Sequence, residues 1–170
     1  LLLVIILLYN YIESKIKFKI FNNIYIMDPK YYLILIPIIA VYTTGYYFPV
    51  RDYEDKKIKF QPPAYVFGIV WPILLTLIGI SWYMRPELSL YYGILTFLLS
   101  IWMILYTYSK KIAFIDIIVT ILFTLYLISI KTKSKKNKLN IIKSIDKPAA
   151  LLIPLVLWLS FASYLGFQSL

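Results

Sequence analysis

Residues 60–83 read FQPPAYVFGIVWPILLTLIGISWY and contain no charged side chain. From Ala64 to Met84 the chain is apolar over the length that a membrane span needs, which is about 20 residues. A Pro-Pro pair at 62–63 precedes this run, and proline is well tolerated in the first turn of a helix. The charged turn at 85–87 closes it. We therefore predict a transmembrane helix over residues 64–84.

Four further apolar stretches follow the same pattern of charged or proline-containing borders. They cover residues 31–48, 88–108, 112–130 and 149–170. Their apolar runs are continuous, whereas the strands of a membrane barrel alternate with a period of two. The sequence therefore predicts an all-α membrane protein, a bundle of five transmembrane helices.

The composition supports a membrane protein and narrows its chemistry. Of 170 residues, 61% are apolar and 15% are charged, against about 45–50% and about 25% in soluble domains. The net charge of +10 comes from short basic runs between apolar stretches, such as residues 131–138, so we expect contact with lipid headgroups and not with nucleic acid. The absence of Cys and His excludes disulfides and the usual zinc sites, and we expect no cofactor and no metal.

Residues 1–26 fit this scheme poorly. The apolar start LLLVIILLY is too short to span a membrane, and Met27 stands just before the first good span. Residues 1–26 are either a true extension, such as a clipped signal or anchor, or sequence upstream of a start at Met27. We favour the start at Met27, which makes residues 27–170 the transmembrane domain.

Asp116 is the one charged residue inside a predicted span. It lies about one helical turn beyond Lys110-Lys111, where it can pair with these lysines or reach water. An interfacial anchor is favoured over a functional carboxylate, because a proton relay needs further ionisable groups in the hydrocarbon.

Three tryptophans lie within spans, away from the membrane interfaces where Trp usually gathers. Trp71, Trp102 and Trp158 belong to the second, third and fifth spans. They can line one cavity for a planar apolar ligand, or they can be ordinary packing residues. Pro72 and Pro154 also lie inside spans, where each removes a backbone hydrogen bond and favours a kink.

Two blocks of sequence resemble the translocator protein/tryptophan-rich sensory protein (TspO/MBR) family. Its loop one–helix two signature is matched by Phe60, Pro62, Pro63, Phe67, Gly68, Trp71, Leu74 and Gly79. Its last helix is matched by residues 149–165, which include Pro154, Trp158, Phe161 and Ala162. The family has Trp after the Pro-Pro pair, where this chain has Tyr65. In loop one, which covers the ligand in this family, the family has Trp-Tyr where this chain has Arg51-Asp52.

The resemblance implies a five-helix bundle, a homodimer, with a pocket beneath loop one that binds porphyrins, sterols and synthetic ligands. The ligand-binding residues that it implies are Gly45, Tyr53, Lys57, Pro62, Pro63, Tyr65, Phe67, Trp71, Trp102, Tyr106, Trp158, Phe161 and Ala162. It further implies the mitochondrial outer membrane or another intracellular membrane, if the chain is eukaryotic or belongs to a virus of a eukaryotic host.

Three functions remain open at this point. The first is a membrane receptor or carrier for planar apolar ligands. The second is photo-oxidative porphyrin breakdown that uses tryptophan, as some bacterial relatives are associated with. The third is an interaction protein that acts through the basic run at 131–138. Because no acid–base pair or nucleophile–base dyad is evident, a binding protein is favoured over an enzyme.

Overall fold

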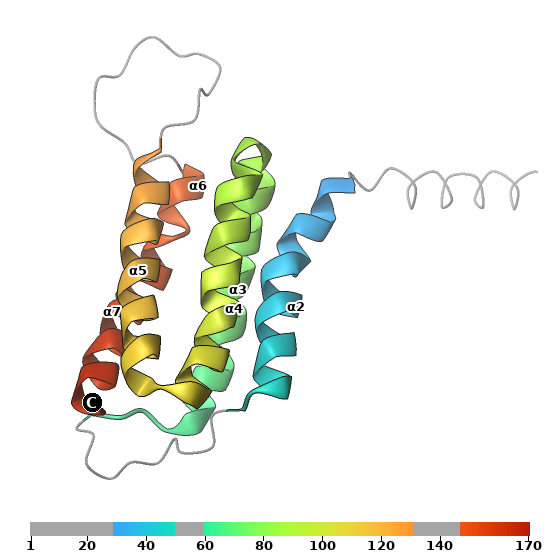
Figure 1. Ribbon diagram of the computed structural model, residues 1–170. Coiled ribbons are helices and arrows are strands. Elements are labelled where there is room, and N and C mark those ends of the chain that lie inside the picture. The colour runs from blue at the N-terminus through green and yellow to red at the C-terminus, as the bar shows by residue number, and fades with distance from the viewer. Residues whose placement is uncertain (1–28, 50–59, 131–146) are drawn as a thin grey trace, which may run out of the picture. The chain divides into compact units, whose positions relative to one another are not determined.

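The predicted apolar runs form the helices of the computed structural model (Figure 1). The structure describes residues 29–49, 60–130 and 147–170, and these contain helices and no strand. The elements are η1 (Pro29–Tyr31), α2 (Tyr32–Tyr47), α3 (Ala64–Met84), η2 (Pro86–Leu88), α4 (Ser89–Tyr108), α5 (Lys110–Ser129), α6 (Lys147–Ala150) and α7 (Ile153–Gln168). The chain divides into two compact units, Leu1–Tyr31 and Tyr32–Leu170, and the bundle is the second. The prediction for residues 1–26 lies outside the described residues.

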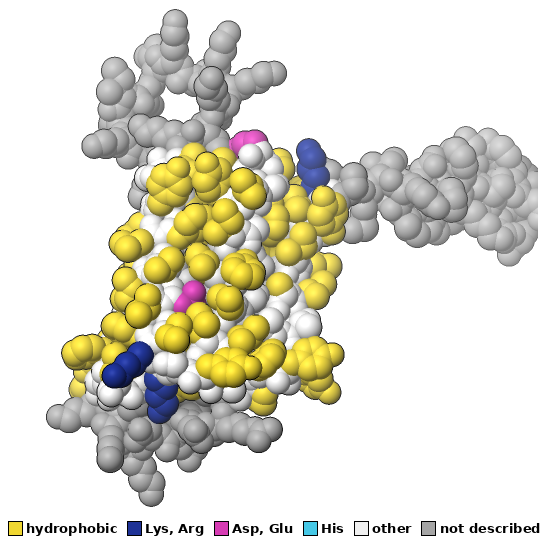
Figure 2. Space-filling view, viewed as in Figure 1, with side chains coloured by type: hydrophobic (Ala, Val, Ile, Leu, Met, Phe, Trp, Pro, Cys, Tyr) yellow, Lys and Arg dark blue, Asp and Glu magenta, His cyan; other side chains and the backbone are white. Residues whose placement is uncertain are grey.

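Within the second unit, α2 packs against α3 and α4, and α5 packs against α4 and α7. The α4–α5 turn and the C-terminus lie at one end of the bundle, and the α3–α4 turn lies at the other (Figure 1). The face in view is largely apolar between the ends, with basic side chains near the end that carries the α4–α5 turn and one acidic side chain partway along (Figure 2). Four segments of the described chain are long and apolar enough to cross a membrane: Ala64–Met84, Pro86–Tyr108, Lys110–Ser129 and Lys147–Gln168. The protein is an integral membrane protein.

Two of the five predicted spans differ from the single long helices that we expected. The first, α2, has 16 residues and is therefore about 24 Å long, less than the hydrocarbon core of about 30 Å. The fifth is divided into α6 and α7 at Leu151–Leu152. Pro154 accounts for this break, because it has no N–H to donate to the carbonyl of Ala150. The Leu152 N–H instead makes a shorter-range bond to the Ala149 carbonyl at 3.1 Å.

The half of the bundle near the α3–α4 turn is closely packed. Its centre is formed by fully buried Leu75, Ile78, Leu95, Leu127 and Leu152. Lipid tails are as apolar as leucine, so the helices gain from close van der Waals contact more than from leaving water. The core of the bundle therefore lies at this end.

Polar groups join the helices at this same end. The Ser81 hydroxyl donates to the Pro148 carbonyl at 2.7 Å and lies 2.5 Å from the Tyr92 hydroxyl. A hydroxyl has one hydrogen, so Tyr92 must be the donor to Ser81. These bonds connect α3, α4 and α6.

Arg85 follows α3 and is only 1% exposed, although a charged residue in a turn between spans is expected to be solvated. Its Nη2 atom donates to the Ile130 carbonyl at 2.7 Å, and the guanidinium also approaches the Leu127 carbonyl at 3.4 Å. Both carbonyls belong to the C-terminal end of α5, where a helix has unsatisfied acceptors and a partial negative charge. Arg85 therefore fastens the end of α5 to the α3–α4 turn.

Candidate ligand pocket

The half of the bundle near the α4–α5 turn contains a cavity of about 800 Å³. Each of the five long helices contributes the part of its length that lies nearest this end. The contributions come from Val41–Tyr46 of α2, Ala64–Trp71 of α3, Leu99–Tyr106 of α4, Lys110–Thr120 of α5 and Trp158–Gly166 of α7. The volume lies within the range of about 300–1,000 Å³ that small-molecule sites occupy.

Helical periodicity explains which side chains of α3 face the cavity. Ala64, Phe67, Gly68 and Trp71 follow the spacing i, i+3, i+4, i+7, which places them on one face. Tyr65 lies off this face, and its side chain is 69% exposed. The structure therefore separates Tyr65 from the residues that line the cavity.

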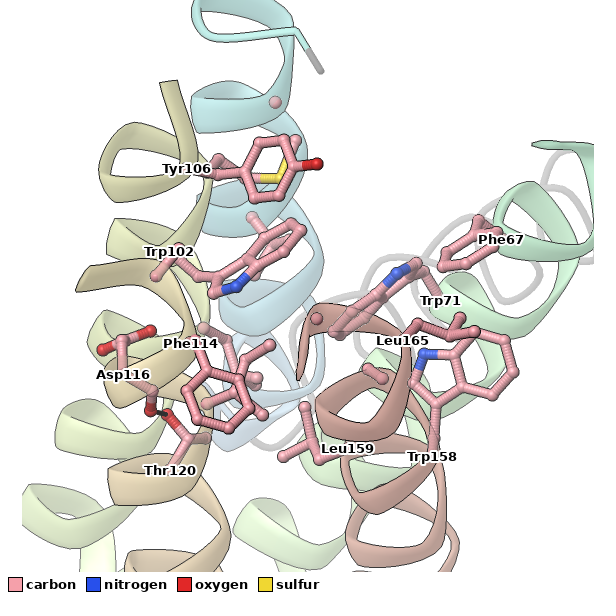
Figure 3. Close-up of a pocket in the computed structure, with 18 of the residues that line it drawn as sticks. Phe67, Trp71, Trp102, Tyr106, Phe114, Asp116, Thr120, Trp158, Leu159 and Leu165 are labelled. Carbon is pink, nitrogen blue, oxygen red and sulfur yellow. Dashed lines mark hydrogen bonds between the residues drawn. The ribbon is translucent and has the colours of Figure 1, made fainter. Parts of the chain in front are cut away.

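The three predicted tryptophans come together around this space, as Figure 3 shows. The Trp158 ring contacts Phe67 of α3 in an edge-on arrangement, with ring centroids 5.3 Å apart. The Trp102 ring lies against Tyr106, with centroids 5.2 Å apart. Trp71, Trp102 and Trp158 thus present aromatic surface from α3, α4 and α7.

Two of these indoles carry a buried polar group. The Nε1 atoms of Trp102 and Trp158 are buried, and neither has a hydrogen-bond partner among the described residues. Trp82, in the packed half, instead donates its N–H to Ser89 at 2.9 Å. Buried Trp usually finds such a partner, so the indole N–H groups of Trp102 and Trp158 are two unsatisfied donors at the cavity wall.

The remaining residues predicted for the site fall into three groups. Besides the tryptophans, the cavity is lined by Gly45, Phe67, Tyr106 and Ala162. Pro62, Pro63, Tyr65 and Phe161 are described but are not among its lining residues; the Phe161 ring lies 5.7 Å from that of Trp158. Tyr53 and Lys57 lie outside the described residues.

The cavity also has a polar wall that we did not predict. Lys110, Asp116 and Thr120 of α5 line it. We expected Asp116 to be an interfacial anchor that pairs with lysine or reaches water; instead its side chain is only 8% exposed, and no ion pair to it exists within the described chain. The sequence does indicate such a polar face, because Asp116 and Thr120 are four residues apart and therefore lie on the same side of a helix.

A comparison with known protein families agrees with the resemblance found in the sequence. The sequence model of the TspO/MBR family matches residues 33–169. This match covers every helix of the bundle that contributes to the cavity. No curated protein is found to match the chain.

Proposed function

This chain belongs to the TspO/MBR family, and from that membership we propose that it binds planar apolar ligands, porphyrins or sterols, in the cavity between its five long helices. It acts as a membrane receptor or carrier for them. The family supports a ligand-binding or transport role in a membrane, and the aromatic wall of the cavity supports the choice of ligand.

The observation that carries this proposal is the convergence of Trp71, Trp102 and Trp158 on one space. Indole rings offer large flat faces, and an aromatic pair contributes about 0.5–1.5 kcal/mol beyond the burial of its area. A flat polycyclic ligand fits such walls better than a flexible chain does. The free N–H groups of Trp102 and Trp158 would donate to an acceptor on the ligand, such as a carbonyl or ring nitrogen.

Titration with protoporphyrin tests the proposal. We expect Trp71→Leu combined with Trp158→Leu to weaken protoporphyrin binding about 5- to 150-fold, from the loss of two aromatic contacts. The dissociation constant is measured from the absorbance of the porphyrin, so that the signal does not depend on tryptophan fluorescence. Competition with cholesterol in the same assay distinguishes the two ligand classes.

Trp82→Leu is the matched control. Trp82 is stacked on Tyr92 in the packed half, with ring centroids 5.8 Å apart, and it does not line the cavity. We expect this variant to lose stability while its folded fraction binds protoporphyrin as the wild type does. Unchanged affinity in the double variant would show that the cavity is not the binding site.

The homodimer stays a prediction, as does photo-oxidative breakdown of a bound porphyrin. Product spectra of the protoporphyrin complex after illumination in air test the latter, since a carrier leaves the porphyrin spectrum intact. The third hypothesis, an interaction protein acting through residues 131–138, concerns residues outside those described.

A further inference from the structure

Asp116 places an acid in the part of the cavity wall that α5 forms (Figure 3). Its side chain is 8% exposed, and its Oδ2 atom is buried without a hydrogen-bond partner among the described residues. Buried polar atoms in proteins are almost always partnered. A carboxylate oxygen of this kind in a cavity wall is therefore available to accept a hydrogen bond from a ligand.

Four Ser and Thr side chains are buried on α4 and α5; three have already given their hydrogen to a backbone carbonyl, and the fourth, Thr96, makes no hydrogen bond to Asp116. The Thr120 hydroxyl donates to the backbone carbonyl of Asp116 at 2.8 Å, and Thr124 donates to that of Thr120 at 2.7 Å. Across the α4–α5 contact, Ser100 donates to the Thr96 carbonyl at 2.8 Å. Since a hydroxyl has only one hydrogen, none of these three has a second one for the carboxylate.

We propose that Asp116 accepts a hydrogen bond from the ligand, and that the ligand is a planar apolar molecule with an N–H or O–H donor on the edge that faces α5. This inference rests on the proposed function and adds a polar requirement to it. The donor is the outward-facing N–H of a nitrogen heterocycle such as carbazole or the hydroxyl of a sterol. The N–H groups of a porphyrin point into the centre of its ring, so a porphyrin would not make this bond.

The charges on α5 also define an orientation for the ligand. Lys110 lies six residues before Asp116, which is about 9 Å along the helix axis, at the end of the bundle with the α4–α5 turn. An acidic group on a ligand would be attracted by Lys110 and repelled by Asp116. A ligand with both groups would therefore bind with its acid toward Lys110 and its donor toward Asp116.

A pair of probes that differ only in the donor tests the inference. Carbazole and N-methylcarbazole share a flat tricyclic body, and only carbazole has an N–H. Cholesterol and its methyl ether form the corresponding pair for an O–H donor. Dissociation constants are measured with radiolabelled probes by scintillation proximity, with every protein in the same detergent, so that partition into micelles cancels between variants.

We expect wild-type protein to bind the donor-bearing member of at least one pair about 10- to 150-fold more tightly than its methylated partner, as for a hydrogen bond to a charged group. The ratio should fall to a few-fold in Asp116→Asn, which keeps one acceptor oxygen, and to about one in Asp116→Leu. Thr124→Val is the control, because Thr124 lies on α5 outside the cavity wall, and it should keep the wild-type ratio.

A ratio near one for both pairs in the wild type would overturn the inference, and so would a wild-type ratio that persists in Asp116→Leu. If N-methylcarbazole still competes with protoporphyrin in these cases, the pocket stands and only the role of Asp116 fails. If no probe binds the wild type and protoporphyrin does not bind either, the proposed function fails as well. The pair that shows the preference identifies the donor as N–H or O–H.

Discussion

Gly79 lies where the backbone of α3 closely approaches that of α2, and its replacement by alanine should force the two helices apart. A Cβ atom at this position would lie 2.7 Å from the Cα atom and 2.8 Å from the carbonyl carbon of Ile34. Carbon atoms pack at about 3.5–4.0 Å, so the backbones must separate by about 1 Å. Overpacking of a core costs about 1–3 kcal/mol, and here the obstacle is backbone that cannot rotate away. We expect Gly79→Ala to lower the free energy of unfolding by an amount in this range.

The measurement is unfolding in mixed micelles as SDS is added, followed by circular dichroism. Gly93→Ala is the matched control, since Gly93 lies inside α4 and a Cβ there would meet nothing within 4 Å. This variant should be as stable as the wild type, or more stable by up to about 1 kcal/mol, because alanine is the better helix former. If Gly79→Ala proved as stable as Gly93→Ala, the close contact between α2 and α3 would be refuted.

Two further predictions concern the packed half of the bundle. Arg85→Met should lower the free energy of unfolding by about 1.5–3 kcal/mol, because the carbonyls of Leu127 and Ile130 lose charged donors. Glu87→Gln, in the same turn, is the control and should have little effect in the same SDS titration. Ser81→Ala should destabilise more than Tyr92→Phe does, since Ser81 takes part in two hydrogen bonds and Tyr92 in one of them. A double-mutant cycle on this pair should give a coupling of about 0.5–1.5 kcal/mol, and additive effects would contradict the bond.

The helices were predictable because a bilayer demands long apolar runs, and charges and prolines mark where such runs end. The second span was predicted at residues 64–84, which are the bounds of α3. The break at Leu151–Leu152 was harder to predict, because proline inside a membrane helix sometimes kinks it and sometimes interrupts it. In this chain the helix is interrupted ahead of Pro154, and Leu152 at the break is fully buried.

The cavity was predictable in its aromatic part and not in its polar part. Trp71, Trp102 and Trp158 stand out because Trp is unusual in the middle of spans. Asp116 was assigned to the interface because its distance along the chain from Lys110 is short. That assignment left out the helix phase, which turns Asp116 toward the same face as Ala113, Ile117 and Thr120. The burial of Arg85 depends on the carbonyls of a distant helix end, which no local pattern reveals.

The division of the bundle into a packed half and a half that contains the cavity has a consequence for sequence evolution. If the cavity binds a ligand as proposed, substitutions around it should alter which molecule is bound, while the tightly packed half keeps the chain folded. Ligand specificity could therefore change in evolution without loss of fold stability.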